Sequence, residues 1–286
     1  MPSLKALRKR IGTVRSTQQI TKAMKMVAAA KLRRAQDTAE RARPYAQKLA
    51  EMFGAVAAGV SAEANPLLAR REERRADMLL ITSDRGLCGG YNANLLRLAE
   101  TVLRKGGREV STFVVGRKAL EYLRRRSIPI QSERTGLLHQ SAVEVAAAIA
   151  DELSARFVAG ESDAVYLVYS KFRSAISQIP TVVPLLPVAL PEATEASGPE
   201  VEYIFEPPQA ALLGELLPAY LRTLILQALL EAAASEHGAR MTAMENATTN
   251  ASDMIERLTL SMNRARQATI TTELMEIVSG AEALKG

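Results

Sequence analysis

The stretch AAAKLRRAQDTAERARPYAQKLAEMFGAV, residues 28–56, decides the fold of this chain. Its apolar residues recur in strict steps of three and four, at Leu32, Ala35, Ala39, Ala42, Ala46, Leu49, Phe53 and Val56. A period of 3.5 residues sustained this long is typical of a left-handed coiled coil. The spacing begins earlier, at Leu4, so we predict one helix over residues 1–60, with Ser3 as its N-cap and a kink at Pro44.

The C-terminal end of the chain repeats this pattern. Residues 208–286 contain one interior proline, Pro218, and a run of apolar residues in steps of four and three at Ala251, Ile255, Leu258, Met262 and Ala265. A helix of about 75 residues would be over 100 Å long. Two long helices at opposite ends of a chain pair most simply antiparallel, and the longer C-terminal helix should project beyond the pair.

The middle of the chain, residues 74–206, has the pattern of an α/β domain. Nine of the 12 aromatic residues lie in it. We predict strands at 76–83, 109–115, 163–172 and 201–205, helices at 94–105, 118–125 and 142–157, an extended segment at 179–190 and a loop at 191–199. This alternation favours a mostly parallel, Rossmann-like sheet. The expected fold class is therefore α/β plus a long antiparallel α-helical coiled coil, with the helices as a rod and the α/β domain as its base.

Composition excludes several classes of protein. The chain has 286 residues, 48% of them hydrophobic, which is enough for a sizeable core. One cysteine and two histidines exclude an internal disulfide and argue against a metal site. Uninterrupted apolar runs are too short to span a bilayer. We expect no metal and no cofactor.

The motif DRGLCGGY, residues 84–91, is the most tempting chemical site. It follows a predicted strand and precedes a helix, where α/β folds often bind phosphate. Its glycine spacing is not G-x-G-x-x-G, no P-loop motif occurs in the chain, and Asp84 would repel phosphate. A structural turn is therefore favoured over a nucleotide site, with Cys88 packed as a small hydrophobe. We expect His237 to be solvated or paired, and no catalytic constellation stands out.

Charge points to a partner for the N-terminal helix. Residues 1–50 contain 13 Lys and Arg against Asp37 and Glu40, so a segment of +11 stands within a chain of +6. Such a helix can bind nucleic acid, acidic lipid or an acidic protein surface. Its basic residues are interleaved with the heptads, and no aromatic platform for stacking accompanies them. A basic coiled-coil nucleic-acid-binding protein remains the alternative to a protein-binding rod, and a Rossmann-type enzyme with helical arms is a more distant one.

Four motifs together resemble one family. They are ITKAMKMVAAAKLRRAQ (20–36), ITSDRGLCGGYNANL (81–95), ARMTAMENAT (239–248) and RARQATITTELMEIVSGAEAL (264–284). In this order and across the whole chain they are similar to the gamma subunits of F-type ATP synthase. The resemblance implies a non-catalytic central-stalk rotor, which transmits torque between the membrane c-ring and a ring of three alpha and three beta subunits. The alpha and beta subunits, the epsilon subunit and the c-ring are the implied partners, and catalysis takes place on beta.

The resemblance also implies roles for particular residues. Contacts with the catalytic ring map onto Lys22, Met24, Lys25, Arg240, Arg266, Gln267, Thr271 and Glu276. A segment facing the c-ring and epsilon maps onto Tyr203, Phe205 and Glu206. Chloroplast members carry a cysteine-containing regulatory insertion that this chain lacks, so thiol regulation of that kind is not expected. No transit peptide precedes Met1, which favours a bacterial protein held at the cytoplasmic face of the inner membrane only through its complex.

Overall fold

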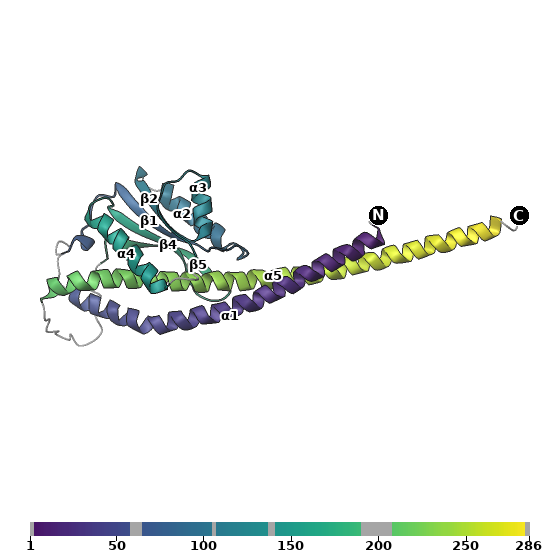
Figure 1. Cartoon of the computed structure of the whole chain (residues 1–286), viewed down its shortest axis with the longest axis horizontal. Helices are drawn as coiled ribbons and strands as arrows, with labels where there is room; N and C mark the ends of the chain where they lie inside the picture. The colour runs from purple at the N-terminus through teal and green to yellow at the C-terminus, as the bar shows by residue number, and fades with distance from the viewer. Residues whose placement is uncertain (1–2, 58–64, 105–106, 137–140, 190–207, 284–286) are drawn as a thin grey trace. The chain divides into compact units, whose positions relative to one another are not determined.

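The computed structural model describes residues 3–57, 65–104, 107–136, 141–189 and 208–283 (Figure 1). Two long helices dominate it: α1 (Leu4–Ala57, 54 residues) and α5 (Gln209–Ala283, 75 residues). Both were expected from the apolar spacing. The Ser3 hydroxyl accepts a hydrogen bond from the Ala6 amide at 3.3 Å, as an N-cap does. Pro44 lies inside α1 and Pro218 inside α5, and neither proline ends its helix.

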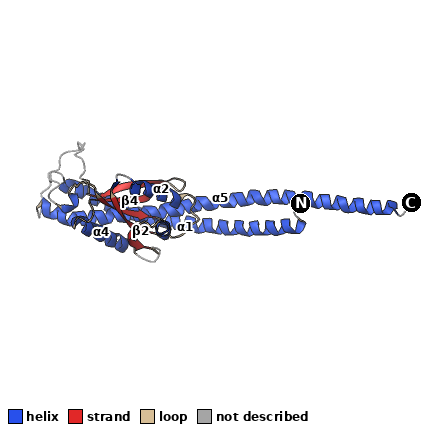
Figure 2. Ribbon diagram, turned by 90° about the horizontal axis from the view of Figure 1, so that it is seen from above, coloured by secondary structure: helices blue, strands red, loops and turns tan. Residues whose placement is uncertain are grey.

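The part of the chain between α1 and α5 forms one five-stranded sheet, whose strands are red in Figure 2. Its strands are β1 (Arg75–Ile81), β2 (Glu109–Val115), β3 (Ile130–Arg134), β4 (Ala164–Phe172) and β5 (Gln178–Leu186), in the order β3-β2-β1-β4-β5. The first four strands are parallel, and β5 runs antiparallel to β4. In the register, Leu79 of β1 is opposite Phe113 of β2 and Leu167 of β4. The predicted, mostly parallel sheet is confirmed.

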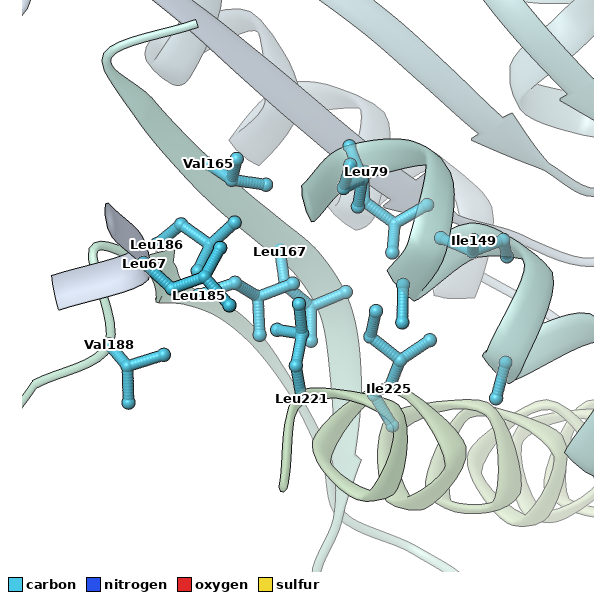
Figure 3. Packing of buried hydrophobic residues seen from close by; sticks show 14 of the residues in the cluster. Leu67, Leu79, Ile149, Val165, Leu167, Leu185, Leu186, Val188, Leu221 and Ile225 are labelled. Carbon is cyan, nitrogen blue, oxygen red and sulfur yellow. The ribbon is translucent and has the colours of Figure 1, made fainter. Parts of the chain in front are cut away.

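The sheet is buried on both faces, which is why its central strands are continuously apolar. Against one face pack α2 (Tyr91–Arg104) and α3 (Arg117–Arg125), around Met78, Leu80 and Leu95. Against the other pack α4 (Ala142–Val158), the short 3-10 helix η2 (Pro66–Leu68) and the first half of α5. Leu221 and Ile225 of α5 point toward Leu167 in this second core (Figure 3).

Two local expectations differ from the structure, and two others cannot be compared with it. The strand β3 was not expected, because its residues alternate between half-buried and exposed and include Ser, Glu and Arg. The helix α2 begins at Tyr91, three residues before the predicted Asn94. The expected strand at 201–205 and loop at 191–199 fall outside the described residues.

The chain divides into two compact units, and the division crosses both long helices. The terminal unit comprises residues 1–28 and 241–286, and the core unit comprises residues 29–240. The predicted segments 1–60, 74–206 and 208–286 follow the ends of elements instead. The reason for the difference is that residues 53–57 of α1 and the Leu-rich first half of α5 pack into the same hydrophobic core as the sheet.

In each unit the two helices run antiparallel. In the terminal unit, the Thr21 and Thr248 hydroxyls are 2.8 Å apart, while the Gln18 amide donates to the Ser252 hydroxyl at 2.6 Å. The residue number on α5 therefore rises, from 248 to 252, as the residue number on α1 falls, from 21 to 18. In the core unit the Phe53 ring stacks on the Tyr220 ring, with centroids 4.6 Å apart. The expected antiparallel pairing is confirmed.

The helix α5 is also long and apolar enough to cross a membrane by length and composition alone. The uninterrupted apolar runs of the sequence are too short to predict such a segment, but an average over 18 residues tolerates the few charged residues between them. Leu213, Leu217, Leu221 and Ile225, spaced every four residues, are fully buried in the core unit. These four residues form the part of the apolar surface of α5 that packs on the sheet.

Candidate partner-binding surfaces

The 84–91 turn is held by its own polar groups. The two oxygens of the Asp84 carboxylate accept hydrogen bonds from the backbone amides of Arg117 and Gly136, each at 3.0 Å. The Asn92 side chain accepts from the Ser83 amide at 3.1 Å and donates to the Ser83 hydroxyl at 2.8 Å. Asp84 therefore joins three loops at the end of the sheet, which confirms the reading of a structural turn.

Arg240 of α5 fastens this turn to the helix. Its guanidinium donates to the Arg85 carbonyl at 3.1 Å and to the Gly86 carbonyl at 3.3 Å. It also forms an ion pair with Glu236, one helical turn earlier, at 2.7 Å. The Arg240 side chain is only 12% exposed and that of Glu236 21%. We call these three contacts of Arg240, with Glu236 and the carbonyls of Arg85 and Gly86, the Arg240 clamp.

Burial shifts the ionisation of the groups around the clamp. The pKa of the Glu236 carboxyl is raised by burial, although Arg240 opposes this shift. The His237 ring, 3.3 Å from the Arg240 guanidinium, is 8% exposed, and burial together with the positive charges of Arg240 and Lys31 lowers its pKa to about 4. His237 is thus a neutral, buried side chain at pH 7.

Cys88 is buried inside the turn, and burial raises the pKa of its thiol. A thiol that is protonated and covered is a poor nucleophile. The prediction that Cys88 packs as a small hydrophobe is confirmed. Among the described residues, no group of three His, Cys, Asp or Glu side chains is placed to hold a metal ion.

The first predicted contact group lies on α1 in the terminal unit. Lys22 is exposed, whereas Met24 is half-buried. Lys25 forms an ion pair with Glu245 of α5. The structure therefore distinguishes the two lysines: Lys25 is engaged within the chain, and Lys22 presents its charge on the surface.

The second predicted contact group lies near the end of α5. Arg266, Gln267, Thr271 and Glu276 are all exposed, and the Thr271 hydroxyl donates to the Gln267 carbonyl at 3.0 Å. Every side chain from 266 to 281 is exposed, including the large apolar residues Ile270, Leu274, Met275, Ile277 and Val278. We call residues 266–281 the bare segment of α5. No described residue of the terminal unit covers their side chains.

The predicted contact residues thus fall into separate places. Lys22, Met24 and Lys25 share one stretch of α1, and the four residues of the bare segment share another of α5. Arg240 belongs to the core unit and is engaged in its clamp. Tyr203, Phe205 and Glu206 belong to the part of the chain that the structure leaves undescribed. Sequence reasoning missed the clamp, for which the i, i+4 spacing of Glu236 and Arg240 was the available signal.

Comparison with known proteins gives one consistent result. The ATP synthase family model matches residues 3–284. The chain is 52% identical over 285 residues to the ATP synthase gamma chain of Pelotomaculum thermopropionicum, and 52% identical over 291 residues to that of an Anaeromyxobacter strain, covering all of both chains in each case.

A solved structure shares the fold. A chain of the Euglena gracilis mitochondrial ATP synthase, from a structure described as containing OSCP, F1 and the c-ring, matches with a TM-score of 0.73. The match has 22% identity and covers 98% of this chain and 94% of that one. At 22% identity this structural match shows the fold alone. The family is shown by the bacterial relatives, which are 52% identical over their full length. The chain therefore belongs to the family of ATP synthase gamma chains, the non-catalytic central-stalk rotor subunits of the F-type enzyme.

Proposed function

We propose that the paired ends of α1 and α5 turn inside a ring of alpha and beta subunits, while the α/β domain binds the epsilon subunit and the c-ring. In this role the chain carries torque between ion flow at the membrane and ATP chemistry on beta. As a gamma chain it is a peripheral part of a membrane-bound complex. We further propose that it works on the cytoplasmic face of a bacterial inner membrane.

The observation that carries this proposal is the exposure of large apolar side chains on the bare segment of α5. Its apolar residues Ile270, Leu274, Ile277 and Val278 are each about half exposed or more. They recur at helical spacing, so they form one stripe along the helix. Contiguous apolar surface of this kind marks a site where another protein binds. An apolar sleeve formed by partner subunits would cover the stripe without locking it in one orientation.

The asymmetry of the helix pair explains how rotation would act on catalysis. One shaft cannot present the same face to three equivalent subunits. Each beta subunit would therefore meet different contacts and be biased toward a different conformation, since only differential contact energy shifts an equilibrium. Rotation would pass each bias from one subunit to the next.

The separate contact groups suit different parts of this task. The exposed Lys22 would attract an acidic loop of beta over a distance, since a lysine charge on a flexible stem fixes no single geometry. Arg266, Gln267, Thr271 and Glu276 would contact the catalytic subunits beside the apolar stripe. The resemblance assigns Tyr203, Phe205 and Glu206 to the c-ring and epsilon. Arg240 would act through the turn that it holds.

Co-purification with affinity-tagged beta tests the proposal. The wild-type chain should be recovered together with alpha, beta and epsilon. The variant Ile270→Asp/Leu274→Asp places two charges in the stripe and should lose most of the recovered beta. Thr272→Asp adds a charge to the same bare segment on another side of the helix and should retain it. Far-UV circular dichroism of all three chains checks that α5 still folds.

Two outcomes would contradict the proposal. Recovery of nucleic acid in place of beta, with binding that weakens steeply as salt rises, would favour the basic coiled-coil nucleic-acid-binding protein. Equal recovery of beta by both variants would remove the apolar stripe from the interface.

A further inference from the structure

The turn between β4 and β5 carries the most exposed large apolar side chain among the described residues. This side chain is Ile176, which is 83% exposed. The turn comprises residues 173–177, which lie between the two strands in the core unit, and we call it the β4–β5 tip. None of its residues belongs to the contact groups assigned above. Any binding by this tip is therefore additional to the role of the bare segment and of the Arg240 clamp.

The backbone of the β4–β5 tip is closed by its own hydrogen bonds. The Arg173 and Ser174 amides donate to the Ser177 carbonyl at 3.2 Å and 3.0 Å. The Ser174 hydroxyl accepts from the Ile176 and Ser177 amides at 3.3 Å and 3.0 Å. These bonds hold the tip in one conformation before any partner arrives.

The tip is also anchored to α5. The Gln178 side-chain amide donates to the Ala175 carbonyl at 2.8 Å. Gly238 of α5 lies close to this carbonyl, since a Cβ added to Gly238 would be 3.3 Å from the Ala175 oxygen. Near it on α5, the Ser235 hydroxyl donates to the Ser170 carbonyl of β4 at 2.9 Å. Ala175 therefore lies against the helix, and the apolar side chain that follows it faces solvent.

A fixed tip with an apolar side chain held outward is suited to docking. Single exposed apolar residues are common on protein surfaces and need no explanation. Here Ile179, at the start of β5, is a second one and is 41% exposed. Because the backbone of the tip is already ordered, burying Ile176 in a partner would cost little conformational entropy. Burial of an isoleucine side chain is favourable in proportion to the apolar area that leaves water.

The charge around the tip is positive. Lys171 and Arg173 are exposed, and residues 171–180 contain no Asp or Glu. Lys171 lies near enough to Glu231 of α5 to lower the pKa of that carboxyl, so its charge is partly balanced within the chain. Arg173 forms no ion pair with any described residue. The unbalanced charge of the tip is therefore a guanidinium three residues from Ile176.

Two other kinds of partner fit these features less well. β5 is an edge strand, but Pro180 and Pro184 interrupt its hydrogen-bonding edge, which disfavours the addition of a strand from another chain. A nucleic acid would attract the guanidinium of Arg173, but its phosphates would leave Ile176 without an apolar contact. An acidic protein surface with an apolar hollow satisfies both side chains.

We propose that the β4–β5 tip is a docking site for a protein surface on which carboxylates border an apolar hollow. Ile176 fills the hollow, and Ile179 extends the apolar contact along β5. The guanidinium of Arg173 pairs with a carboxylate at the rim, for which its planar donors are suited. The proposal goes beyond the rotor role, because it needs neither the bare segment nor the Arg240 clamp.

Photo-cross-linking in cells that make the full chain tests this site. The photoreactive residue p-benzoylphenylalanine replaces Ser177, which is exposed and adjacent to Ile176. Irradiation should give one dominant adduct, and mass spectrometry should identify in it a partner peptide that contains both carboxylates and large apolar residues. Affinity-tagged beta is recovered from the same cells. Absence of the chain from that fraction would contradict the rotor role, while the adduct alone decides the proposal for the tip.

Three variants that carry the same photoreactive residue separate the two contacts. Ile176→Asp should lower the yield of the adduct about tenfold, because the apolar anchor is lost. Arg173→Glu should lower it about fivefold, at the upper end of what an exposed ion pair contributes. Val143→Asp is the matched control, since Val143 is a 61% exposed aliphatic residue of the core unit on α4, and it should leave the yield unchanged. Far-UV circular dichroism checks each fold, and Ile176→Ser takes the place of Ile176→Asp if the latter unfolds.

Three results would overturn the proposal. No adduct from a folded chain would show that the tip has no partner. An adduct with nucleic acid, with a second copy of this chain or with a peptide that lacks carboxylates would assign the tip to another kind of contact. Equal yields from Ile176→Asp and Val143→Asp would show that the apolar side chain does not dock.

Discussion

Replacing Arg240 with methionine should detach the 84–91 turn from α5. Methionine keeps an unbranched apolar stem of similar reach but removes every donor of the guanidinium. The carbonyls of Arg85 and Gly86 lose a charged partner, and Glu236 stays beside them without its ion pair. The backbone hydrogen bonds of α5 are untouched, so the substitution acts on the Arg240 clamp alone.

The size of the effect follows from how deeply the clamp is buried. The side chains of Arg240 and Glu236 are 12% and 21% exposed. Solvent therefore screens this ion pair much less than it screens an ion pair on the surface. Removing one partner of a buried pair costs about 3–5 kcal/mol. The pKa of Glu236 is already raised by burial, so this carboxyl can take up a proton and moderate the loss. We therefore expect the lower end of that range, about 3 kcal/mol.

The single cysteine provides a local assay. Cys88 is 2% exposed inside the turn, so a thiol reagent reaches it only when the turn opens. A loss of about 3 kcal/mol should speed its modification about a hundredfold. Urea unfolding followed by far-UV circular dichroism should show a matching fall in the free energy of unfolding. The double variant Arg240→Met/Glu236→Gln removes the unpaired charge and should recover about half of the loss.

Arg266→Met is the matched control, because it deletes the same guanidinium on the same helix at an exposed position. It should change the free energy of unfolding by less than about 0.5 kcal/mol. If Arg240→Met labels Cys88 no faster than this control does, the clamp does not hold the turn and the reasoning fails.

Gly116→Ala should destabilise the chain by more than about 3 kcal/mol in urea unfolding, because its φ is +98° and a Cβ would lie 2.2 Å from the Thr82 carbonyl oxygen. Gly214→Ala, in open space on α5, should instead stabilise it by about 0.5–1 kcal/mol. The pKa of His237 is lowered to about 4 from 6.5, so the unfolded chain binds more protons between these values. Stability should therefore fall by about 3 kcal/mol as pH drops through this window, and His237→Gln should remove that fall in urea titrations at several pH values. Lys22→Glu should weaken ATP-driven proton pumping in vesicles while leaving urea unfolding unchanged, and equal pumping would exclude Lys22 from coupling.

Much of the fold was predictable because its signals are local. The three- and four-residue steps of α1 and the apolar runs of β1, β2 and β4 lie within single elements. The strand β3 carries no such signal, since Ile130–Arg134 is a half-exposed edge that exists by pairing with β2. The antiparallel direction of β5 follows from the tight turn at Ser174–Ser177, which is too short for a parallel crossover.

The clamp shows why a site is harder to predict than an element. Arg240 meets the Arg85 carbonyl across 155 residues of sequence, and no spacing rule relates the two. The local pattern placed His237 in a polar helical stretch, where solvation or pairing was expected. The fold covers that side of α5, so His237 is buried and not solvated, and it is paired with the Arg240 guanidinium. The contacts of both residues depend on tertiary packing, which the helical pattern does not contain.

The pairing of the first helix with the last has a consequence for biosynthesis. Thr21 contacts Thr248, which the ribosome synthesises 227 residues later. At about 5–20 residues per second, that interval is about 11–45 seconds. During this interval the apolar residues of α1 in the terminal unit have no partner helix in the nascent chain. We expect chaperones to engage this helix during translation, and its strong positive charge to help keep the nascent chain from aggregating.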